Sequence, residues 1–323
     1  MKSFSKHISK IYIHCLTFSS KGAILYVENL YKDGKFLTNN FVSYKLNFSN
    51  RILKTITFRE RYEFLKDLFD NFEDKYPVFL EKMKEIREKV FNRENMIITF
   101  IGNKKDYLHF KTNIGKYLKK INNKHYEEVL IDNKISCNSK AFVIDKKVNY
   151  IQEGFKLRTK IEDSLLCNII SNKYLMKKIR IDNGAYGAWA MDRGSYITLT
   201  TYRDPKIKET LSIFKELPEF IKNLNLTEEE LTNYKILTNN LDNPKSIFAK
   251  ANIAINNYLS YIDVKELQEE LDTMFKMKVT DLRKKSEVFK KGLDKRVLAI
   301  SADKETIKNN EDLFEEVEDF MSE

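Results

Sequence analysis

The residues best suited to chemistry lie in one stretch, 180–205, which reads RIDNGAYGAWAMDRGSYITLTTYRDP. It holds three of the chain's nine glycines, Gly184, Gly187 and Gly194, and the only tryptophan, Trp189. Glycine reaches backbone conformations that other residues avoid, so this concentration indicates special backbone geometry at one place. We therefore expect the functional site here.

The local motifs of metal, serine-hydrolase and phosphate chemistry are absent from the sequence. A zinc hydrolase needs two imidazoles one helical turn apart, as in H-x-x-E-H, so that both converge on one ion. The four histidines, at 7, 14, 109 and 125, form no such pair, so we expect this chain to bind no metal and no cofactor. G-x-S-x-G, the Walker loop and G-x-G-x-x-G are also missing.

The pattern around the site predicts a helix ending near Arg180, a tight glycine turn, and two strands joined by a hairpin at 192–195. Alternate residues of the second strand should share one face: Tyr196, Thr198, Thr200 and Tyr202. Asp204 is expected to cap the next helix, with Arg203 in an ion pair. We assign Trp189 to the core.

The rest of the chain predicts two α+β regions, each with strands first and helices later. In 1–125 we expect strands at 10–18, 23–31 and 41–48, helices between 58 and 92, a strand at 96–101 and a helix at 106–121. Residues 126–140 are polar, lack a sustained period and form the predicted linker. In 141–323 we expect strands at 142–144 and 148–155, followed by a helix through 165–179 and the hairpin. A helix from 207, interrupted at 218, should come next. After it we expect a capping box at 227–230 and a strand at 297–302.

Length and charge limit the class of protein. At 323 residues the chain can form two domains of ordinary size. The net charge is +10, but the tail from Asp303 to Glu323 carries nine acidic and two basic residues. Apolar residues keep helical spacing in this tail, which predicts a docked acidic terminal helix. The positive charges elsewhere are dispersed, which argues against nucleic acid as the partner.

The sequence also favours an intracellular protein. No stretch approaches the roughly 18 apolar residues that cross a bilayer, and the apolar run near the N-terminus is short and interrupted by His14, so it makes a poor signal peptide. The three cysteines are odd in number and widely spaced, without C-x-x-C, as expected for reduced thiols.

Two ordered runs carry a resemblance to a known family. IRIDNGAYGAWA at 179–190, followed by TYRDPKIKETL at 201–211, resembles the last domain of the presequence protease branch of the pitrilysin/insulinase-type zinc metallopeptidases, which also contains falcilysin. The resemblance extends from about Phe142 to the C-terminus. Residues 41–120 are similar to part of the preceding domain, in a shortened form.

The resemblance implies an α+β protein with two domains of the pitrilysin/mitochondrial-processing-peptidase-like fold, built of antiparallel sheets with helices on one face. Residues 1–125 would be a partial penultimate domain, and 141–323 the C-terminal peptidase-like domain. In this family two such halves enclose a chamber for unfolded peptides, and the zinc belongs to the other half. The half seen here would contribute Arg180 and Tyr186 as catalytic contacts to a carbonyl oxygen. The adjoining turn would bind substrate through Asn183, Gly184, Ala185 and Gly187.

The implied function is therefore the non-zinc, substrate-contacting half of a peptidase, inactive without a zinc-bearing partner half. Two alternatives remain at this point. The chain could be a non-catalytic scaffold or degenerate relative, in which Arg180 caps its helix and Tyr186 packs in the glycine turn. A basic nucleic-acid-binding protein is the remaining interpretation, and it would show salt-sensitive binding to oligonucleotides.

Overall fold

A computed structural model describes the chain at residues 32–47, 49–50, 59–127, 136–240 and 246–319. It forms two compact units. The first, which we call the sheet unit, combines Met1–Glu63, Asn133–Asp242 and Gln268–Glu323. The second, the helical unit, combines Phe64–Asp132 with Asn243–Leu267. Each unit thus draws on segments far apart in the sequence.

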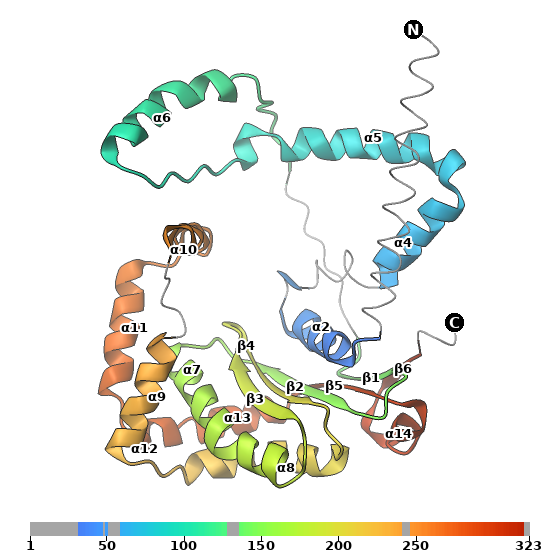
Figure 1. Cartoon of the computed structure of the whole chain (residues 1–323), viewed down its shortest axis with the longest axis vertical. Coiled ribbons are helices and arrows are strands. Elements are labelled where there is room, and N and C mark those ends of the chain that lie inside the picture. The colour runs from blue at the N-terminus through green and yellow to red at the C-terminus, as the bar shows by residue number, and fades with distance from the viewer. Residues whose placement is uncertain (1–31, 48, 51–58, 128–135, 241–245, 320–323) are drawn as a thin grey trace. The chain divides into compact units, whose positions relative to one another are not determined.

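The sheet unit is built on a six-stranded mixed sheet (Figure 1). Its strands are β1 (Ser139–Val143), β2 (Tyr150–Lys156), β3 (Gly187–Asp192), β4 (Tyr196–Tyr202), β5 (Val297–Ala302) and β6 (Glu316–Glu318). Their order across the sheet is β3-β4-β2-β5-β1-β6. β1 runs parallel to β5 and β6, while β2 pairs antiparallel with β4 and β5, and β3 with β4. The predicted hairpin is therefore one end of this sheet.

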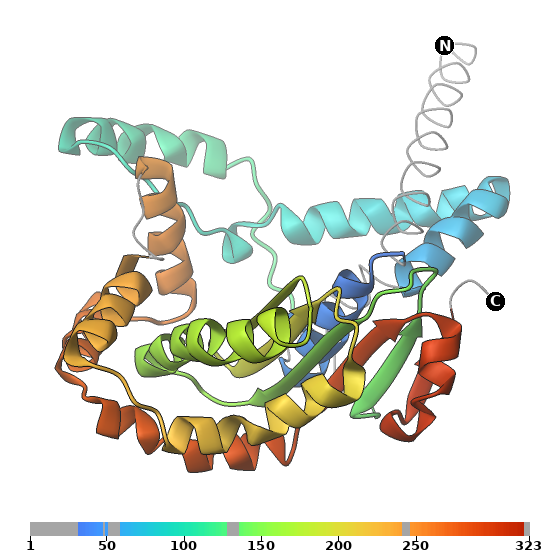
Figure 2. The ribbon, with the colours of Figure 1, turned by 60° about the horizontal axis from the view of Figure 1, so that its bottom comes forward.

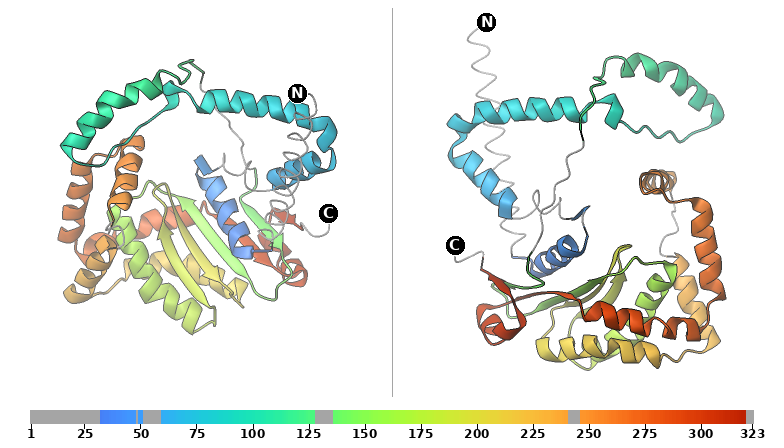
Figure 3. Two further views of the ribbon diagram at one scale, coloured as in Figure 1. Left: turned by 45° about the horizontal axis from the view of Figure 1, so that its top comes forward. Right: turned by 180° about the vertical axis from the view of Figure 1, so that it is seen from behind.

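Helices cover both faces of the sheet (Figure 2). On one face lie α7 (Ile161–Ile169), η2 (Ile170–Ile181), α8 (Ile207–Lys222), α9 (Glu228–Asn240), α12 (Val279–Arg283) and α13 (Ser286–Leu293). The core on this side receives alternate strand residues, such as Ile151 and Phe155 from β2 and Ile197 and Leu199 from β4. Figure 3 shows the second face, which is covered by α2 (Gly34–Leu46).

Helix α2 forms a smaller, separate core with its face of the sheet. Leu37, Phe41 and Tyr44 repeat at helical spacing and pack with Tyr150 of β2 and Tyr196 of β4. The Asp33 side chain accepts hydrogen bonds from the backbone N–H groups of residues 35 and 36, so it caps the helix. The α2 segment is therefore an integral layer of the sheet unit.

The helical unit contains α5 (Phe72–Val90), η1 (Arg93–Asn95), α6 (Lys104–Leu118) and α10 (Ile247–Leu259). Helices α4 (Arg59–Asp70) and α11 (Val264–Lys276) each have residues in both units. The Phe100 ring stacks on that of Phe110 at a centroid distance of 5.2 Å, which holds the segment before α6 against the helix. The predicted helices between 58 and 92 and at 106–121 are confirmed as α4, α5 and α6.

The α+β class is confirmed, as are the hairpin and the strands at 142–144, 148–155 and 297–302. Some details differ. The sheet is mixed instead of antiparallel throughout, and α2 adds a helix to its second face. The strand predicted at 41–48 is wrong, because residues up to 46 belong to α2. The strand predicted at 96–101 is also wrong, because this segment has no paired strand among the described residues. The strands predicted at 10–18 and 23–31 lie outside the described residues.

The acidic tail also differs from the prediction of a docked terminal helix. In the described part, a short helix α14 (Lys304–Lys308) and a turn η3 (Glu311–Leu313) precede strand β6. Strand β6 pairs with β1, and Lys140 on β1 stabilises this pairing. Its Nζ lies 3.3 Å from a carboxylate oxygen of Glu316 and 2.9 Å from one of Glu318. Earlier, α8 continues through Pro218 instead of being interrupted there.

A first prediction concerns the contact between α13 and β2. A Cβ atom built on Gly292 would lie 2.2 Å from Cδ2 of Phe155, a fully buried ring. We expect Gly292→Ala to lower the free energy of unfolding by about 1–3 kcal/mol, because the core must shift to admit the methyl group. Urea denaturation measures this change. Gly115→Ala on α6, where a Cβ meets nothing within 4 Å, is the control and should not destabilise.

A second prediction concerns Glu153, which is 2% exposed on β2, with Oε2 lying 3.2 Å from Nε of Arg296. Burial raises the pKa of Glu153 from 4.5 to about 7, against the opposing effect of Arg296. A carboxyl with a raised native pKa stabilises the fold below its unfolded pKa, and this contribution is lost as pH rises through 7. We expect this group to lower the free energy of unfolding by about 3 kcal/mol between pH 4 and 8. Urea denaturation of wild type and Glu153→Gln across this range measures the difference; parallel curves would contradict it.

Candidate functional site

The candidate site begins where η2 ends and the chain turns into edge strand β3. Ile179 is fully buried one residue before Arg180, and it anchors the last turn of the helix. The N–H of Gly184 donates to the carbonyl of Arg180 at 3.2 Å, and that of Ala185 donates to the carbonyl of Ile179 at 3.1 Å. Gly184 adopts φ +84°, the left-handed conformation that ends many helices. The predicted glycine turn is therefore confirmed.

Arg180 and Tyr186 lie on either side of this turn, and both side chains are exposed. Tyr186 is 67% exposed, and its ring meets that of Tyr202 edge-on at 5.9 Å between centroids. Its N–H donates to the carbonyl of Tyr202 at 3.1 Å, so its backbone is fixed to β4. Nη1 of Arg180 lies 3.6 Å from Sδ of Met176, and within the described ranges its guanidinium has no carboxylate partner. Both groups are thus available to a ligand.

The four residues predicted to bind substrate have different environments. Ala185 is buried in the helix-side core, so it can offer a ligand only its backbone. Gly187 lies against the Trp189 ring, where an added Cβ would come within 2.9 Å. The Nδ2 atom of Asn183 is buried and lacks a hydrogen-bond partner among the described residues, whereas Gly184 is exposed. A substrate-binding role for these four residues stays a prediction.

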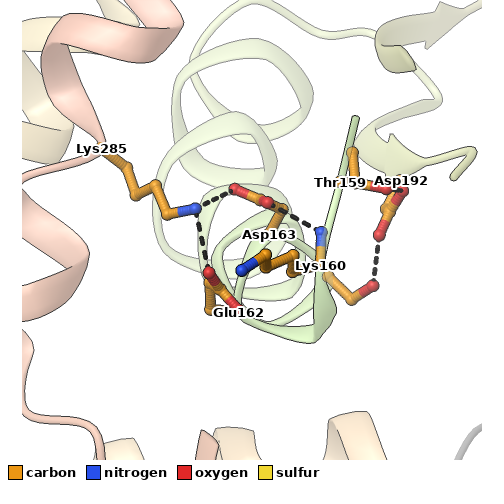
Figure 4. A network of polar contacts seen from close by, with 7 residues as sticks. Thr159, Lys160, Glu162, Asp163, Asp192 and Lys285 are labelled. Carbon is orange, nitrogen blue, oxygen red and sulfur yellow. Dashed lines mark hydrogen bonds and ion pairs between the residues drawn. The ribbon is translucent and has the colours of Figure 1, made fainter. Parts of the chain in front are cut away.

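Asp192 fixes the far end of the hairpin to the start of α7 (Figure 4). One carboxylate oxygen accepts hydrogen bonds from the Thr159 hydroxyl at 2.5 Å and the Gly194 N–H at 2.7 Å, and the other accepts from the Ser164 hydroxyl at 2.6 Å. Along the edge of β3, the Ser171 hydroxyl accepts the N–H of Ala190 at 2.9 Å. The edge strand is thus held at its turn and at its middle.

The same network secures the first turn of α7. The Asp163 carboxylate accepts the N–H of Lys160 at 3.0 Å, and its other oxygen lies 2.9 Å from Nζ of Lys285 (Figure 4). Nζ of Lys285 also lies 3.3 Å from a carboxylate oxygen of Glu162. Negative charge at a helix N-terminus is favourable, so these contacts stabilise the helix on which the hairpin rests.

Aromatic and cationic side chains continue from Tyr186 across the α2 face. The Tyr202 ring lies 5.3 Å from that of Tyr150, and Nζ of Lys35 lies 5.5 Å from the Tyr202 centroid and 4.9 Å from that of Trp189. Burial raises the pKa of Tyr150, while a hydrogen bond to Arg203 acts in the opposite direction. Sequence reasoning missed Lys35 and Tyr150, since the strands predicted at 23–31 and 41–48 leave Lys35 between strands instead of on a helix that packs over Tyr150.

Two further predictions for this stretch need correction. Arg203 adopts φ +52° and lies over the Tyr202 ring at 5.6 Å, and no described carboxylate forms the expected ion pair with it. Trp189 is only partly buried, so it is not a core residue. The cap at Asp204 holds in modified form: its carboxylate accepts the Lys206 N–H and the Thr210 hydroxyl, and α8 starts at Ile207.

Within the described residues, His, Cys, Asp and Glu form no group of three or more that could hold a metal ion. The chain as described therefore does not fit a zinc site. None of the described helices is both long and apolar enough to span a membrane.

The fold of the chain is shared with a solved structure. The chain resembles the crystal structure of a peptidase M16 inactive domain from Pseudomonas fluorescens, with a TM-score of 0.65 over 90% of this chain and 70% of that chain. The sequence identity is 14%, so this likeness shows the fold alone.

The particular family follows from sequence comparison. The model of the PreP C-terminal domain matches residues 139–303, just over half of the chain, which therefore belongs to that family. Protein HypA of Clostridium perfringens is 29% identical over 265 residues, covering 79% of this chain and 27% of that protein. Presequence protease 1, chloroplastic/mitochondrial, of Arabidopsis thaliana is 24% identical over 260 residues, covering 77% of this chain and 24% of that protein. The chain spans about a quarter of the length of these relatives, and the resemblance to presequence proteases is confirmed.

A third prediction tests the anchor at Asp192. Asp192→Ala removes the acceptor of three hydrogen bonds, and we expect the free energy of unfolding to fall by about 2–3 kcal/mol, since hydrogen bonds to a charged group are stronger than neutral ones. Urea denaturation gives the value. Asp182→Ala is the matched control, because among the described residues the Asp182 carboxylate pairs only with the exposed Lys177, an interaction worth about 1 kcal/mol or less. Equal losses in both variants would contradict the anchoring role.

Proposed function

We propose that this chain is the non-zinc, substrate-contacting half of a presequence-protease-like peptidase that degrades unfolded peptides. It would act only together with a zinc-bearing half. Membership of the PreP C-terminal domain family supports the peptidase relationship. The observation that carries the proposal is the exposure of Arg180 and Tyr186 on the two sides of a turn whose backbone is fixed to η2 and β4.

The two side chains suit the chemistry of peptide cleavage. When a peptide bond is attacked, negative charge develops on its carbonyl oxygen. The Arg180 guanidinium and the Tyr186 hydroxyl are both donors, and donors fixed in place before the reaction stabilise such a charge without reorganisation. The zinc-bearing half would supply the attacking water. This chain would hold and polarise the carbonyl group.

The surface of the helical unit supports the need for a partner. Leu80, Met83, Ile86 and Val90 follow one another at intervals of three or four residues on α5 and are all exposed, and that helix buries no residue. Ile247 and Phe248, at the start of α10, are exposed as well. Large exposed apolar surfaces on soluble proteins are usually interaction sites. The coverage of only a quarter of each relative agrees with further domains that would pack here.

The second candidate function is a scaffold that keeps the fold without a catalytic role. The structural likeness to a domain described as inactive favours it. In that case, Arg180 and Tyr186 would be surface residues without effect on peptides. The two functions therefore differ in what substitution of these residues does.

The fourth prediction uses this difference. We expect the chain to increase peptide cleavage when it is mixed with a zinc-bearing N-terminal half of a presequence protease. Arg180→Ala should then lower kcat/KM by about 100- to 1000-fold, the usual loss for one oxyanion donor, and Tyr186→Phe should act in the same direction. Cleavage of a fluorogenic unfolded peptide measures the rates.

Arg158→Ala is the matched control for the loss of an exposed arginine and should leave the rate unchanged. Absence of any gain over the zinc-bearing half alone, or equal rates for all variants, would reject the peptidase half and favour the scaffold.

A further inference from the structure

Two adjoining hollows lie between α2 and the β3–β4 hairpin. Their volumes are about 280 and 320 Å³, and they share Phe36, Asn39 and Arg193. The first is also lined by Lys35, Gln152 and Trp189, and the second by Asn40, Asn50 and Tyr196. We call the pair the α2–hairpin groove. All of these residues belong to the sheet unit, so the groove is formed within one compact body.

Buried amide groups with unused hydrogen-bonding capacity face this groove. Gln152 is 1% exposed, and its Nε2 donates to Oδ1 of Asn39 at 3.3 Å, but its Oε1 has no partner in the described part of the chain. Nδ2 of Asn40 is likewise buried without a described partner. Buried polar atoms are nearly always paired in native proteins, so unpaired ones that line a hollow indicate a ligand. One is an acceptor and the other a donor, as a peptide backbone requires.

The rim of the first hollow is positively charged. Nζ of Lys35 lies above the Trp189 ring, and Arg193 is exposed in the hairpin turn; neither forms an ion pair with a described carboxylate. Asp33 also lines this hollow, but its Oδ1 accepts the N–H groups of Lys35 and Phe36 in capping α2. The hollow therefore carries two cations against one carboxylate that is already used in capping, and the remaining positive charge suits a carboxylate of the ligand.

We propose that the α2–hairpin groove binds an extended peptide segment that carries a carboxylate. The carboxylate lies between Lys35 and Arg193, and backbone groups of the peptide bond to Gln152 and Asn40. The groove follows α2 from Asp33 to Tyr44, about 16 Å at 1.5 Å per residue, which suits about five residues of extended chain. This inference rests on the proposed function, because it gives the same peptide substrate a second contact.

The groove adjoins the first contact. The Tyr202 ring touches that of Tyr186 on one side, and on the other it lies within 5.5 Å of Nζ of Lys35. A peptide held at Tyr186 can therefore continue across Tyr202 to Lys35 and Trp189. The acidic group of the ligand gives the selectivity, because an uncharged peptide would leave both cations unpaired.

The experiment uses Trp189, the only tryptophan of the chain, as a reporter inside the groove. The purified full chain is titrated with an unfolded ten-residue peptide that contains two glutamates and no tryptophan, and tryptophan emission is followed. We expect a saturable change whose apparent Kd rises about tenfold in Gln152→Leu and in Arg193→Met, since each loses one hydrogen bond or charge contact. Arg193 is exposed, so Arg193→Met should keep the fold.

Arg158→Met is the matched control and should bind like wild type. The same peptide with glutamine in place of glutamate should bind about tenfold more weakly. The inference is overturned if tryptophan emission does not change up to millimolar peptide, or if all variants bind with equal affinity. In that case water forms the hydrogen bonds of the buried amides.

The proposed peptidase function and the proposed peptide groove can be rejected independently of each other. If Arg180→Ala leaves reconstituted cleavage unchanged while Gln152→Leu still weakens binding, the proposed function is rejected and the peptide groove is supported. If Arg180→Ala lowers cleavage while Gln152→Leu binds normally, the groove is rejected and the proposed function is supported.

Discussion

The turn at Gly184 determines where the two candidate side chains, Arg180 and Tyr186, lie. Ile179 before it and Ala185 after it are both buried, so the backbone between them must reverse direction within a few residues. Gly184 makes this possible with a positive φ that residues with a Cβ rarely adopt. As a result Arg180 lies in the last turn of η2 and Tyr186 directly precedes β3, and both side chains are exposed. The position of Trp189 follows from the same turn, because β3 starts at Gly187.

The sheet also depends on a segment distant in sequence. Helix α2 is separated from β1 by more than 90 residues, yet it covers the face formed by Phe142, Tyr150 and Tyr196. The family match begins at residue 139 and so leaves α2 out. A fragment starting there would expose these aromatic side chains and lose half of the α2–hairpin groove. The sheet unit is therefore larger than the segment that the family model matches.

The sequence predicted the fold correctly where interactions between residues close in the sequence decide the structure. The hairpin was found because its residues alternate between two buried faces, and the cap at Thr227 because its hydroxyl and the Glu230 carboxylate are three residues apart. Residues 41–48 were misassigned because aromatic and β-branched residues outweighed the helical spacing of Leu37, Phe41 and Tyr44. The isoleucines of 96–101 indicated a strand, but a strand also needs a neighbour with which to pair.

The candidate site was predicted only in part, for a similar reason. Arg180, Tyr186 and the glycine turn lie within one short stretch, so a single ordered motif reveals them. Lys35 and Gln152 reach the same region through the packing of α2 on the sheet, and nothing in their local sequence indicates this. The pairing of Lys140 with Glu316 and Glu318 likewise joins residues about 176 positions apart. Contacts of this kind depend on the tertiary fold.

The two borders of the sheet have a consequence for solubility. An open strand edge invites pairing with any extended chain and is a common start of aggregation. Here β6 is only three residues long and carries two glutamates, while the Ser171 hydroxyl occupies the central N–H of β3. Pairing with a further strand is therefore disfavoured at both borders of the described sheet.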